Sequence, residues 1–375
     1  MALEVVLGLA VAIYALYYLC FVGKEPEVYH CSREGSVAAR LARDLPILKE
    51  KFWPTPGLDN THLQTLLGVV GRRRVDIEFE TECFPLADGG ELYLDWTVAA
   101  KDPMVTCVIL HGTQGSSRSR YIRHVPSPPH DSINRQFLRK GVAQNWRCVV
   151  LHQRGCGASP LRVPKTFHAG LTADTKEVMD AIYRRHGATS QVIAVGFSLG
   201  ANILAKYLGE EGSRAKVDGA VLLSNPWDFC SVGEQLSQGS SRLYCRLLQY
   251  EMNGYVRRHW DQLRQIECLS KKQLDDILSL PSLFDLDMYL AVLPHGFADR
   301  SVPVRVVEDN ENIIFGLTDR GGHLAWLEGW DFWEEAWMDR AVVQFSKALW
   351  SQMPKRRLQK IHTITDPTTS PLRHA

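Results

Sequence analysis

The chain has 375 residues, of which 45% are hydrophobic, so it can bury a core large enough for one big domain with appendages or for two ordinary domains. This composition excludes a disordered chain, and the balance of 43 Lys and Arg against 42 Asp and Glu, without a basic run interleaved with aromatics, argues against a nucleic-acid partner. Nine cysteines without C-x-x-C spacing predict neither a disulfide framework nor a zinc site, and neither a metal nor a cofactor is expected.

Residues 1–23 are predicted to form a single-pass membrane anchor. The run from Ala2 to Val22 is apolar except for Glu4, and as a helix it would span roughly 30 Å, about the hydrocarbon core of one bilayer. A cleaved signal peptide is disfavoured because no basic residue precedes the run. An endomembrane location is expected. Basic residues after the run favour a cytosolic catalytic domain, but acidic residues among them leave the side open: Lys24, Arg33 and Arg40 against Glu25, Glu27 and Glu34.

Residues 24–50 are predicted to be a connector, and residues 51–353 one catalytic domain. A tail at 354–375 lacks apolar periodicity and is expected to be disordered. The domain opens with an antiparallel hairpin, because alternating apolar and polar residues flank the turn Asp88-Gly89-Gly90. The two strands are expected at Arg74 to Thr81 and at Glu91 to Val98.

From Val105 onward, continuous apolar runs alternate with helical patterns, which is typical of a mostly parallel, doubly wound α/β sheet covered on both faces. The expected elements are strands at 105–110, 147–151, 191–195 and 216–224, and a helix at 174–186. Residues 226–295 carry short amphipathic pieces without strand alternation and predict a mobile helical cap. A last short strand at Ile313 to Leu317 and a closing helix at Trp333 to Trp350 complete the domain.

The G-x-S-x-G stretch Gly196-Phe197-Ser198-Leu199-Gly200 follows a β-branched strand and opens a helical pattern. That context predicts Ser198 as a nucleophile on a strained strand-to-helix turn. A serine hydroxyl needs a histidine to accept its proton. His323, held late in the chain in the turn Arg320-Gly321-Gly322-His323-Leu324, is the expected base.

Two backbone amides are expected to stabilise the oxyanion that forms when the serine attacks an acyl carbonyl. They are those of Leu199, directly after the nucleophile, and of Thr113, in the turn His111-Gly112-Thr113. His111 is interpreted as a packing or hydrogen-bonding residue of that turn rather than as a base.

The sequence does not decide which carboxylate would orient His323. Asp309 follows a run that resembles a strand, Val302 to Glu308, yet only three residues separate it from Ile313, too few for a parallel crossover. Either Val302 to Asp309 is a helix and the acid-bearing strand is missing, or the pair is a hairpin and the sheet differs from the standard one. Asp309 is the candidate acid, because it lies between Ser198 and His323 in the sequence.

Several separated motifs across residues 45–350 resemble the YheT-like branch of the α/β-hydrolase superfamily, whose members include membrane-anchored abhydrolase-domain lipases and phospholipid hydrolases. They are Phe52-Trp53-Pro54-Thr55, Asn60-Thr61-His62-Leu63-Gln64-Thr65, Asp88-Gly89-Gly90 with Leu94-Asp95-Trp96, Arg154-Gly155-Cys156-Gly157, Ala169-Gly170 with Thr172 and Asp174, Gly196 to Asn202, and Gly321-Gly322-His323 with Leu327-Glu328-Gly329. The resemblance implies an α/β-hydrolase fold, Ser198 as nucleophile, His323 as base, one amino-terminal membrane helix, and ester substrates with acyl chains. It gives His62-Leu63-Gln64-Thr65 no chemical role.

Two departures from that branch bear on activity. Its members have, between the cap and the final strand, an apolar strand that ends in a paired-aspartate turn followed by proline, and this sequence passes from Pro294 to Arg300 without it. The proline-rich stretch Val125 to Asp131, interpreted as a loop insertion, is the second departure. A triad without its acid loses on the order of 10⁴ in turnover, so hydrolysis would be reduced or lost if the strand is absent.

The sequence therefore predicts a membrane-anchored serine hydrolase that cleaves carboxylic esters of lipids, acylglycerol or phospholipid, through an acyl-enzyme at Ser198. The alternative is a catalytically impaired hydrolase-fold protein that binds lipid or a partner. An acyltransferase outcome finds no support in the sequence, because no H-x-x-x-x-D spacing occurs near the site residues. Head group, acyl-chain length and oligomeric state are left open.

Overall fold

The computed structural model describes residues 2–70, 77–98, 102–117, 137–236, 238–265, 304–330 and 336–352. The chain divides into two compact units. We call Val75–Val302, with which Met353–Ala375 is grouped, the sheet unit, and the two segments Met1–Arg74 and Pro303–Gln352 the terminal unit. Three expectations lie outside the described residues: the insertion at 125–131, the cap beyond residue 265 and the tail from residue 354.

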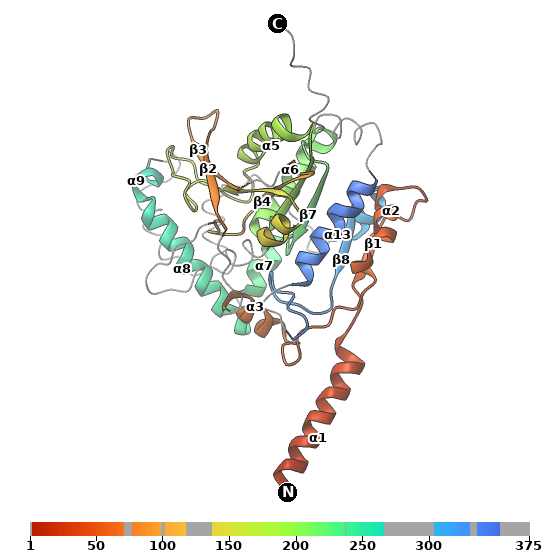
Figure 1. Ribbon diagram of the computed structural model, residues 1–375. Helices are drawn as coiled ribbons and strands as arrows, with labels where there is room; N and C mark the ends of the chain where they lie inside the picture. Colours follow the sequence, from red (N-terminus) through yellow and green to blue (C-terminus); the bar gives the residue numbers. More distant parts are fainter. Residues whose placement is uncertain are drawn as a thin grey trace. The chain divides into compact units, whose positions relative to one another are not determined.

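The sheet unit is built on a six-stranded sheet (Figure 1). Its order is β2 (Phe79–Pro85), β3 (Glu91–Thr97), β5 (Arg147–His152), β4 (Val105–Leu110), β6 (Gln191–Phe197) and β7 (Gly219–Leu223). β3 runs antiparallel to both β2 and β5, while the pairs β5–β4, β4–β6 and β6–β7 are parallel. The predicted sheet, mostly parallel with an amino-terminal hairpin, is confirmed.

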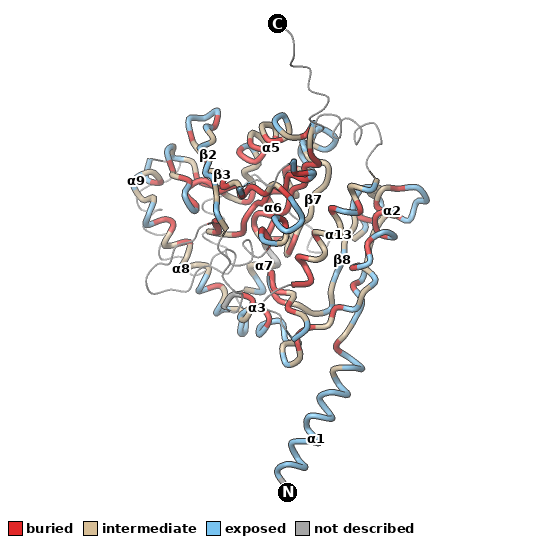
Figure 2. Tube along the Cα trace, in the orientation of Figure 1, coloured by how far each residue is buried: buried red, intermediate tan, exposed pale blue. Residues whose placement is uncertain are grey.

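Burial follows the position of each strand in this sheet. Every residue of β4 and β6 is buried, as expected of strands covered on both faces. Figure 2 shows a cluster of buried residues in the middle of the sheet unit, beside α6. β2, at the edge, carries only half-buried and exposed residues. α5 (Ala173–His186) and α6 (Leu199–Glu211) bury one face each, and Met179 and Leu204 join Val108 and Val192 of the strands in a single core.

The part of the expected cap that is described is helical. It contains α7 (Phe229–Leu236), α8 (Arg242–Arg258) and α9 (Trp260–Leu263). α8 is fixed through Tyr255, whose hydroxyl donates a hydrogen bond to the Arg154 carbonyl at 3.0 Å and lies 2.8 Å from the hydroxyl of Thr166. The Tyr255 ring packs edge-on against Phe167. The carboxyl-terminal half of α8 is therefore part of the core of the sheet unit.

The terminal unit joins the two ends of the described chain. The amino-terminal part contains α1 (Ala2–Tyr17), continued by a π-helical turn at Tyr18–Val22, β1 (Glu27–His30), α2 (Val37–Asp44) and α3 (Thr61–Val70). The carboxyl-terminal part contains α12 (Val304–Asp309), β8 (Ile314–Leu317) and α13 (Trp337–Ser351). Leu41, Ile47 and Phe52 pack with Trp337 of α13, so both parts share one core.

The last strand departs from the expected sheet. β8 forms, but it pairs antiparallel with β1 in a separate two-stranded sheet, in a register that runs from Glu27↔Leu317 to His30↔Ile314. The hairpin alternative is wrong, because the segment before β8 is the helix α12. Only Val307 of α12 is buried, which is the burial of a short surface helix rather than that of a covered strand.

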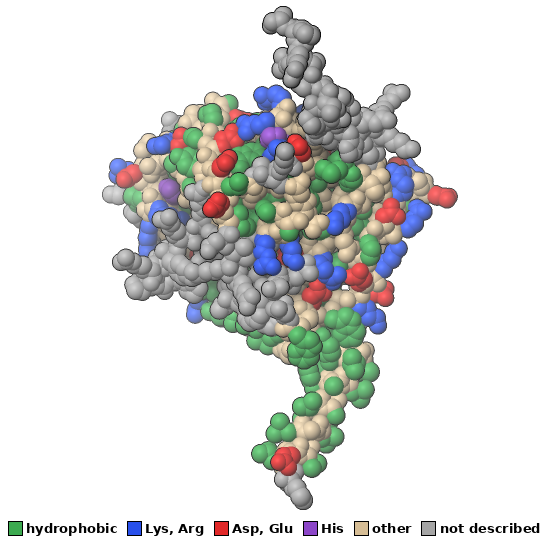
Figure 3. All heavy atoms as spheres, in the orientation of Figure 1, with side chains coloured by type: hydrophobic (Ala, Val, Ile, Leu, Met, Phe, Trp, Pro, Cys, Tyr) green, Lys and Arg blue, Asp and Glu red, His purple; other side chains and the backbone are tan. Residues whose placement is uncertain are grey.

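α1 leaves its apolar surface uncovered. Figure 2 shows the helix exposed along its length, and Figure 3 shows that the exposed side chains are mostly apolar. The stretch Leu3–Val22 is long and apolar enough to cross a membrane. Leaving so much contiguous apolar surface in water is costly.

Candidate active site

The turn between β6 and α6 holds Ser198 in a strained backbone conformation. Ser198 has φ 52° and ψ −119°, a region that costs a non-glycine residue on the order of 1–3 kcal/mol. The two motif glycines allow this turn: a Cβ at Gly196 would lie 2.5 Å from the Cα of Ala201, and a Cβ at Gly200 would run into the backbone carbonyl oxygens at the end of β4. The sharp turn expected from G-x-S-x-G is present, and close backbone approach requires both glycines.

Hydrogen bonds on both sides stabilise this turn. The Ser198 N–H donates to the Leu223 carbonyl at the end of β7, and the Ser198 carbonyl accepts from the Ala201 N–H in the first turn of α6, both at 2.9 Å. The Asn202 amide donates to the Pro226 carbonyl at 3.2 Å, which ties α6 to the loop after β7. Ser198 is partly exposed at the carboxyl edge of the parallel strands, the edge at which α/β sheets bind ligands.

The register of the sheet brings the expected oxyanion donors to this same edge. Leu110 pairs with Gly196 in the neighbouring strands β4 and β6, so the turns that follow the two strands start side by side. Thr113 lies in the turn after β4, and Leu199 is the first residue of α6. The first N–H groups of a helix have no intrahelical acceptors and are available to bind an anion. The structure therefore brings Ser198, Leu199 and Thr113 to one edge of one sheet.

His111 is held by hydrogen bonds in the turn that follows β4. It is buried, its Nε2 accepts from the Gln153 N–H at 3.2 Å, and its Nδ1 lies 2.6 Å from the Gly112 carbonyl, to which it donates as the neutral tautomer. Burial lowers the pKa of His111 to about 4, although the hydrogen bond to Gly112 acts to raise it. With both ring nitrogens engaged, the expected hydrogen-bonding role is confirmed.

His323 lies in the terminal unit, in a narrow turn between β8 and α13. The Gly322 N–H donates to the Ala325 carbonyl at 2.7 Å, and Leu324 has φ 56°. The His323 N–H donates to Oγ1 of Thr65 in α3 at 2.9 Å. The imidazole keeps an exposed surface, yet the surrounding protein desolvates it enough to lower the pKa of His323 to about 4. The ring is therefore neutral at pH 7 and can accept a proton.

α3 also contacts the turn that carries His323 at a second place, through Gln64. Gln64 is buried, its Oε1 accepts from the Leu327 N–H at 3.0 Å, and its Nε2 donates to the Leu327 carbonyl at 3.5 Å. The motif His62-Leu63-Gln64-Thr65 thus acquires a role that the sequence did not give it, which is to fix the turn that carries His323. The signal was the polar pair Gln64-Thr65 directly before the stretch Leu66 to Val70, which has no polar side chain.

Asp309 is not placed as an acid at the end of a strand. It ends α12, its side chain is exposed, and within the described residues no hydrogen bond or ion pair holds its carboxylate in a fixed direction. Residues 266–303, which would have to supply an acid-bearing strand, lie outside the described part of the chain. The geometry gives Asp309 no support beyond its place in the chain order.

The five expected site residues are divided between the two units. Ser198, Leu199 and Thr113 belong to the sheet unit, and His323 and Asp309 to the terminal unit. Within the described ranges, no group of three or more His, Cys, Asp or Glu side chains could hold a metal ion.

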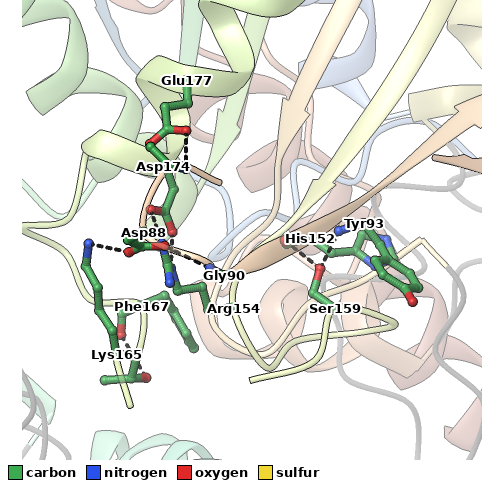
Figure 4. Close-up of polar contacts among 12 residues, drawn as sticks. Asp88, Gly90, Tyr93, His152, Arg154, Ser159, Lys165, Phe167, Asp174 and Glu177 are labelled. Carbon is green, nitrogen blue, oxygen red and sulfur yellow. Dashed lines mark hydrogen bonds and ion pairs between the residues drawn. The ribbon is translucent and has the colours of Figure 1, made fainter. Parts of the chain in front are cut away.

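Figure 4 shows an ion-pair network, centred on the buried Arg154, that joins three of the sequence motifs. Arg154 is 2% exposed and donates to both oxygens of Asp174, at 2.5 and 2.8 Å, and to Asp88 at 2.8 Å. Lys165 binds the same Asp88 carboxylate at 3.0 Å. Burial acts to raise the pKa of Asp88, but the hydrogen bonds from Lys165 and Arg154 outweigh it and lower the pKa to about 2. The network fixes the hairpin turn and the start of α5 to the segment after β5, which is a structural role.

A second set of serine, histidine and aspartate lies in the sheet unit. Ser117 Oγ lies 2.9 Å from His152 Nε2 and donates to Asp95, whose carboxylate is 3.4 Å from His152. Figure 4 also shows His152 beside Ser159, whose hydroxyl donates to the His152 carbonyl at 2.9 Å. Ser117, His152 and Asp95 are each 0% exposed, so a substrate cannot reach them. This set packs the strands and is not an active site.

Comparison with known proteins agrees with this fold. A sequence model of the alpha/beta hydrolase fold matches residues 106–238, which include the whole turn around Ser198. The chain is 24% identical to phospholipase ABHD3 of Homo sapiens over 391 residues, which cover 92% of this chain and 90% of that protein. It is 25% identical to the putative esterase YheT of Escherichia coli (strain K12) over 327 residues, covering 78% and 92% of the two chains. It is 23% identical to the monoacylglycerol lipase of Saccharomyces cerevisiae over 347 residues, covering 80% and 74%.

The order of the sheet, the turn at Ser198 and the matched model show that this chain has the α/β-hydrolase fold. The similarity to ABHD3 and YheT confirms the resemblance to the YheT-like branch. Its relatives therefore include hydrolases named for lipid and ester substrates.

Proposed function

We propose that this protein is a membrane-anchored serine hydrolase that cleaves carboxylic esters of lipids, acylglycerol or phospholipid, through an acyl-enzyme at Ser198. The observation that carries the proposal is the strained backbone of Ser198, held by hydrogen bonds at φ 52° beside the turn that contains Thr113. Such strain persists only where the surrounding structure over-determines it, and it clusters at functional sites.

In the proposed mechanism, Ser198 Oγ attacks the acyl carbonyl carbon while His323 takes the hydroxyl proton. The N–H groups of Leu199 and Thr113 stabilise the negative charge on the carbonyl oxygen. As the tetrahedral intermediate collapses, the bond to the alcohol oxygen breaks and His323 passes the proton to that leaving oxygen. A water molecule then attacks the acyl-enzyme, which releases the fatty acid and restores Ser198.

Two further observations support the lipid and membrane parts of the proposal. The apolar surface of α1 is exposed over a stretch long enough to cross a bilayer. Two relatives are named a phospholipase and a monoacylglycerol lipase, names that point to lipid substrates. A membrane anchor would keep the enzyme at the surface where such substrates are found.

A fluorophosphonate probe tests the nucleophile, because it reacts covalently with an activated serine. The full-length chain is labelled in detergent or in vesicles, and labelling is compared in Ser198→Ala and in Ser213→Ala, a control at an exposed serine outside the site. We expect Ser213→Ala to label like the wild type and Ser198→Ala not to label. Labelling that survives Ser198→Ala would refute the nucleophile.

The second candidate is a hydrolase-fold protein that binds lipid or a partner with little turnover. The observation that favours it is the placement of Asp309 on an exposed helix end instead of a strand end. It predicts vesicle binding without measurable release of fatty acid from phospholipid or acylglycerol. Turnover that disappears in Ser198→Ala would exclude it.

A further inference from the structure

α3 exposes two leucines on the side that faces away from the turn carrying His323. Gln64 is 1% exposed and Gly68 is buried, both against the turn that follows His323. On the other side, Leu63 is 46% exposed and Leu66 is 45% exposed. We call Leu63 and Leu66 the outer α3 face. Leucines three residues apart lie on one side of a helix, so they form a continuous apolar surface.

The segment that leads into α3 is bound to the end of the apolar helix α1. The Tyr17 hydroxyl, at the last residue of α1, donates to the Asp59 carboxylate at 3.1 Å. Arg320, three residues before His323, donates to Tyr17 at 3.3 Å and to the Asp59 carbonyl at 3.0 Å. The Tyr18 hydroxyl donates to the Pro54 carbonyl at 2.5 Å. These contacts join the end of α1, the start of α3 and the turn that carries His323 within the terminal unit.

The contacts limit how far the outer α3 face can lie from a bilayer that surrounds α1. Tyrosines at the end of a membrane helix favour the headgroup layer, which places Tyr17 and its partner Asp59 at that layer. Leu63 and Leu66 follow Asp59 by four and seven residues. Because α3 begins at Thr61, both leucines lie at most roughly 15 Å from Asp59. A helix that runs along the membrane surface keeps such residues at the headgroup layer, which is about 5–8 Å thick.

We propose that the outer α3 face is a lipid-binding surface that rests in the headgroup layer of the membrane anchored by α1. This inference rests on the proposed membrane anchor and adds the surface that faces the lipid. Leu63 and Leu66 would bury their exposed area among lipid groups, as the apolar side of an interfacial helix does. The opposite side of α3 contacts the turn that carries His323, through Gln64 and Thr65. That turn would therefore lie at the lipid surface, where an ester of a membrane lipid can enter from the bilayer.

Photo-crosslinking in vesicles tests the contact. The full-length chain, carrying Ser198→Ala so that no acyl group is transferred from the probe, is placed in phosphatidylcholine vesicles that contain alkyne-tagged phosphatidylcholine. The photoreactive residue p-benzoylphenylalanine replaces Leu63 or Leu66, and as a matched control it replaces Val306. Val306 lies on α12 of the same unit and is 61% exposed, more than either leucine.

We expect light-dependent attachment of tagged lipid at positions 63 and 66 at least fivefold above that at position 306. Flotation of the vesicles checks the anchor separately. Protein that floats but attaches no more lipid at 63 and 66 than at 306, or crosslinks only to itself, would overturn the outer α3 face and leave the anchor standing. Protein that does not float would overturn the anchor and, with it, this inference.

Discussion

The turn that carries Ser198 and the turn that carries His323 are stabilised in different ways. The serine turn depends on the two glycines beside it in sequence, which let its backbone approach the end of β4, and on the hydrogen bond from the Ser198 N–H to Leu223 of β7. The histidine turn is held by α3, whose Thr65 accepts a hydrogen bond from a residue 258 positions later. The first turn should therefore be sensitive to added volume in the backbone, and the second to the loss of single hydrogen-bonding atoms.

Adding one methyl group to the serine turn should have the largest effect. In Gly200→Ala the new Cβ would collide with the carbonyl oxygens of Leu110 and His111, so α6 must move away from β4. We expect the free energy of unfolding to fall by about 1–3 kcal/mol. Labelling by a fluorophosphonate should slow on the order of 100-fold, because the serine and the oxyanion amides shift against each other. Denaturant unfolding and labelling rates measure both.

Gly209→Ala is the matched control on the same helix. A Cβ at Gly209 meets no atom within 4 Å. Alanine is the better helix former, so this variant should be about 0.5–1 kcal/mol more stable than the wild type and should label at the wild-type rate. Equal effects of the two substitutions would contradict the requirement for close approach at Gly200.

The histidine turn should respond to one atom of Thr65. Thr65→Val keeps the shape of the side chain but removes the oxygen that accepts from the His323 N–H. We expect kcat on a soluble ester to fall about 10- to 100-fold with little change in KM, because a base shifted by about 1 Å still lets substrate bind. Thr65→Ser restores the oxygen and should recover most of the rate.

Thr61→Val, at an exposed threonine one turn earlier in α3, controls for a general effect of valine in this helix. A loss of rate shared by Thr61→Val, or one that Thr65→Ser fails to recover, would show that the hydrogen bond to His323 is not what matters.

The difference between the two turns also explains what the sequence could predict. β4 and β6 are continuous apolar runs, and the glycines around Ser198 are adjacent in sequence, so local patterns indicated the strands, the sharp turn and the neighbouring oxyanion amides. The contact of Thr65 with His323 depends on two segments at opposite ends of the chain coming together, and no local pattern contains it.

The region before β8 shows the same limit. The valine-rich run that ends at Asp309 has the composition of a strand, yet it forms the short helix α12 with a single buried valine. Likewise, β8 could be located from its apolar residues but its partner β1 could not, because strand pairing is decided by tertiary packing. Arg154, Asp88 and Asp174 stood out as motif residues, and only the fold shows that they bind one another.

The smallest expected effect is that of substituting Asp309, the candidate triad acid. The pH dependence of kcat/KM shows whether any carboxylate lies beside the His323 ring. Desolvation lowers the pKa of His323 to about 4, so the neutral, proton-accepting form is complete above roughly pH 5. We expect kcat/KM on a soluble ester to rise with pH through about 4 and to stay level through neutrality, since kcat/KM reports the ionisation of the free enzyme. A carboxylate beside the ring would favour the imidazolium and move this rise upward, towards or above the ordinary value of about 6.5.

Asp309→Asn decides whether that carboxylate is Asp309. Because the side chain is exposed at the end of α12, the substitution should change kcat by less than about twofold and leave the rise near pH 4 in place. A loss on the order of 10⁴ would instead identify Asp309 as the triad acid. A rise clearly above pH 6.5 that Asp309→Asn does not move would mean that another carboxylate holds the ring, and Asp-to-Asn substitutions within 266–303 would then search for it.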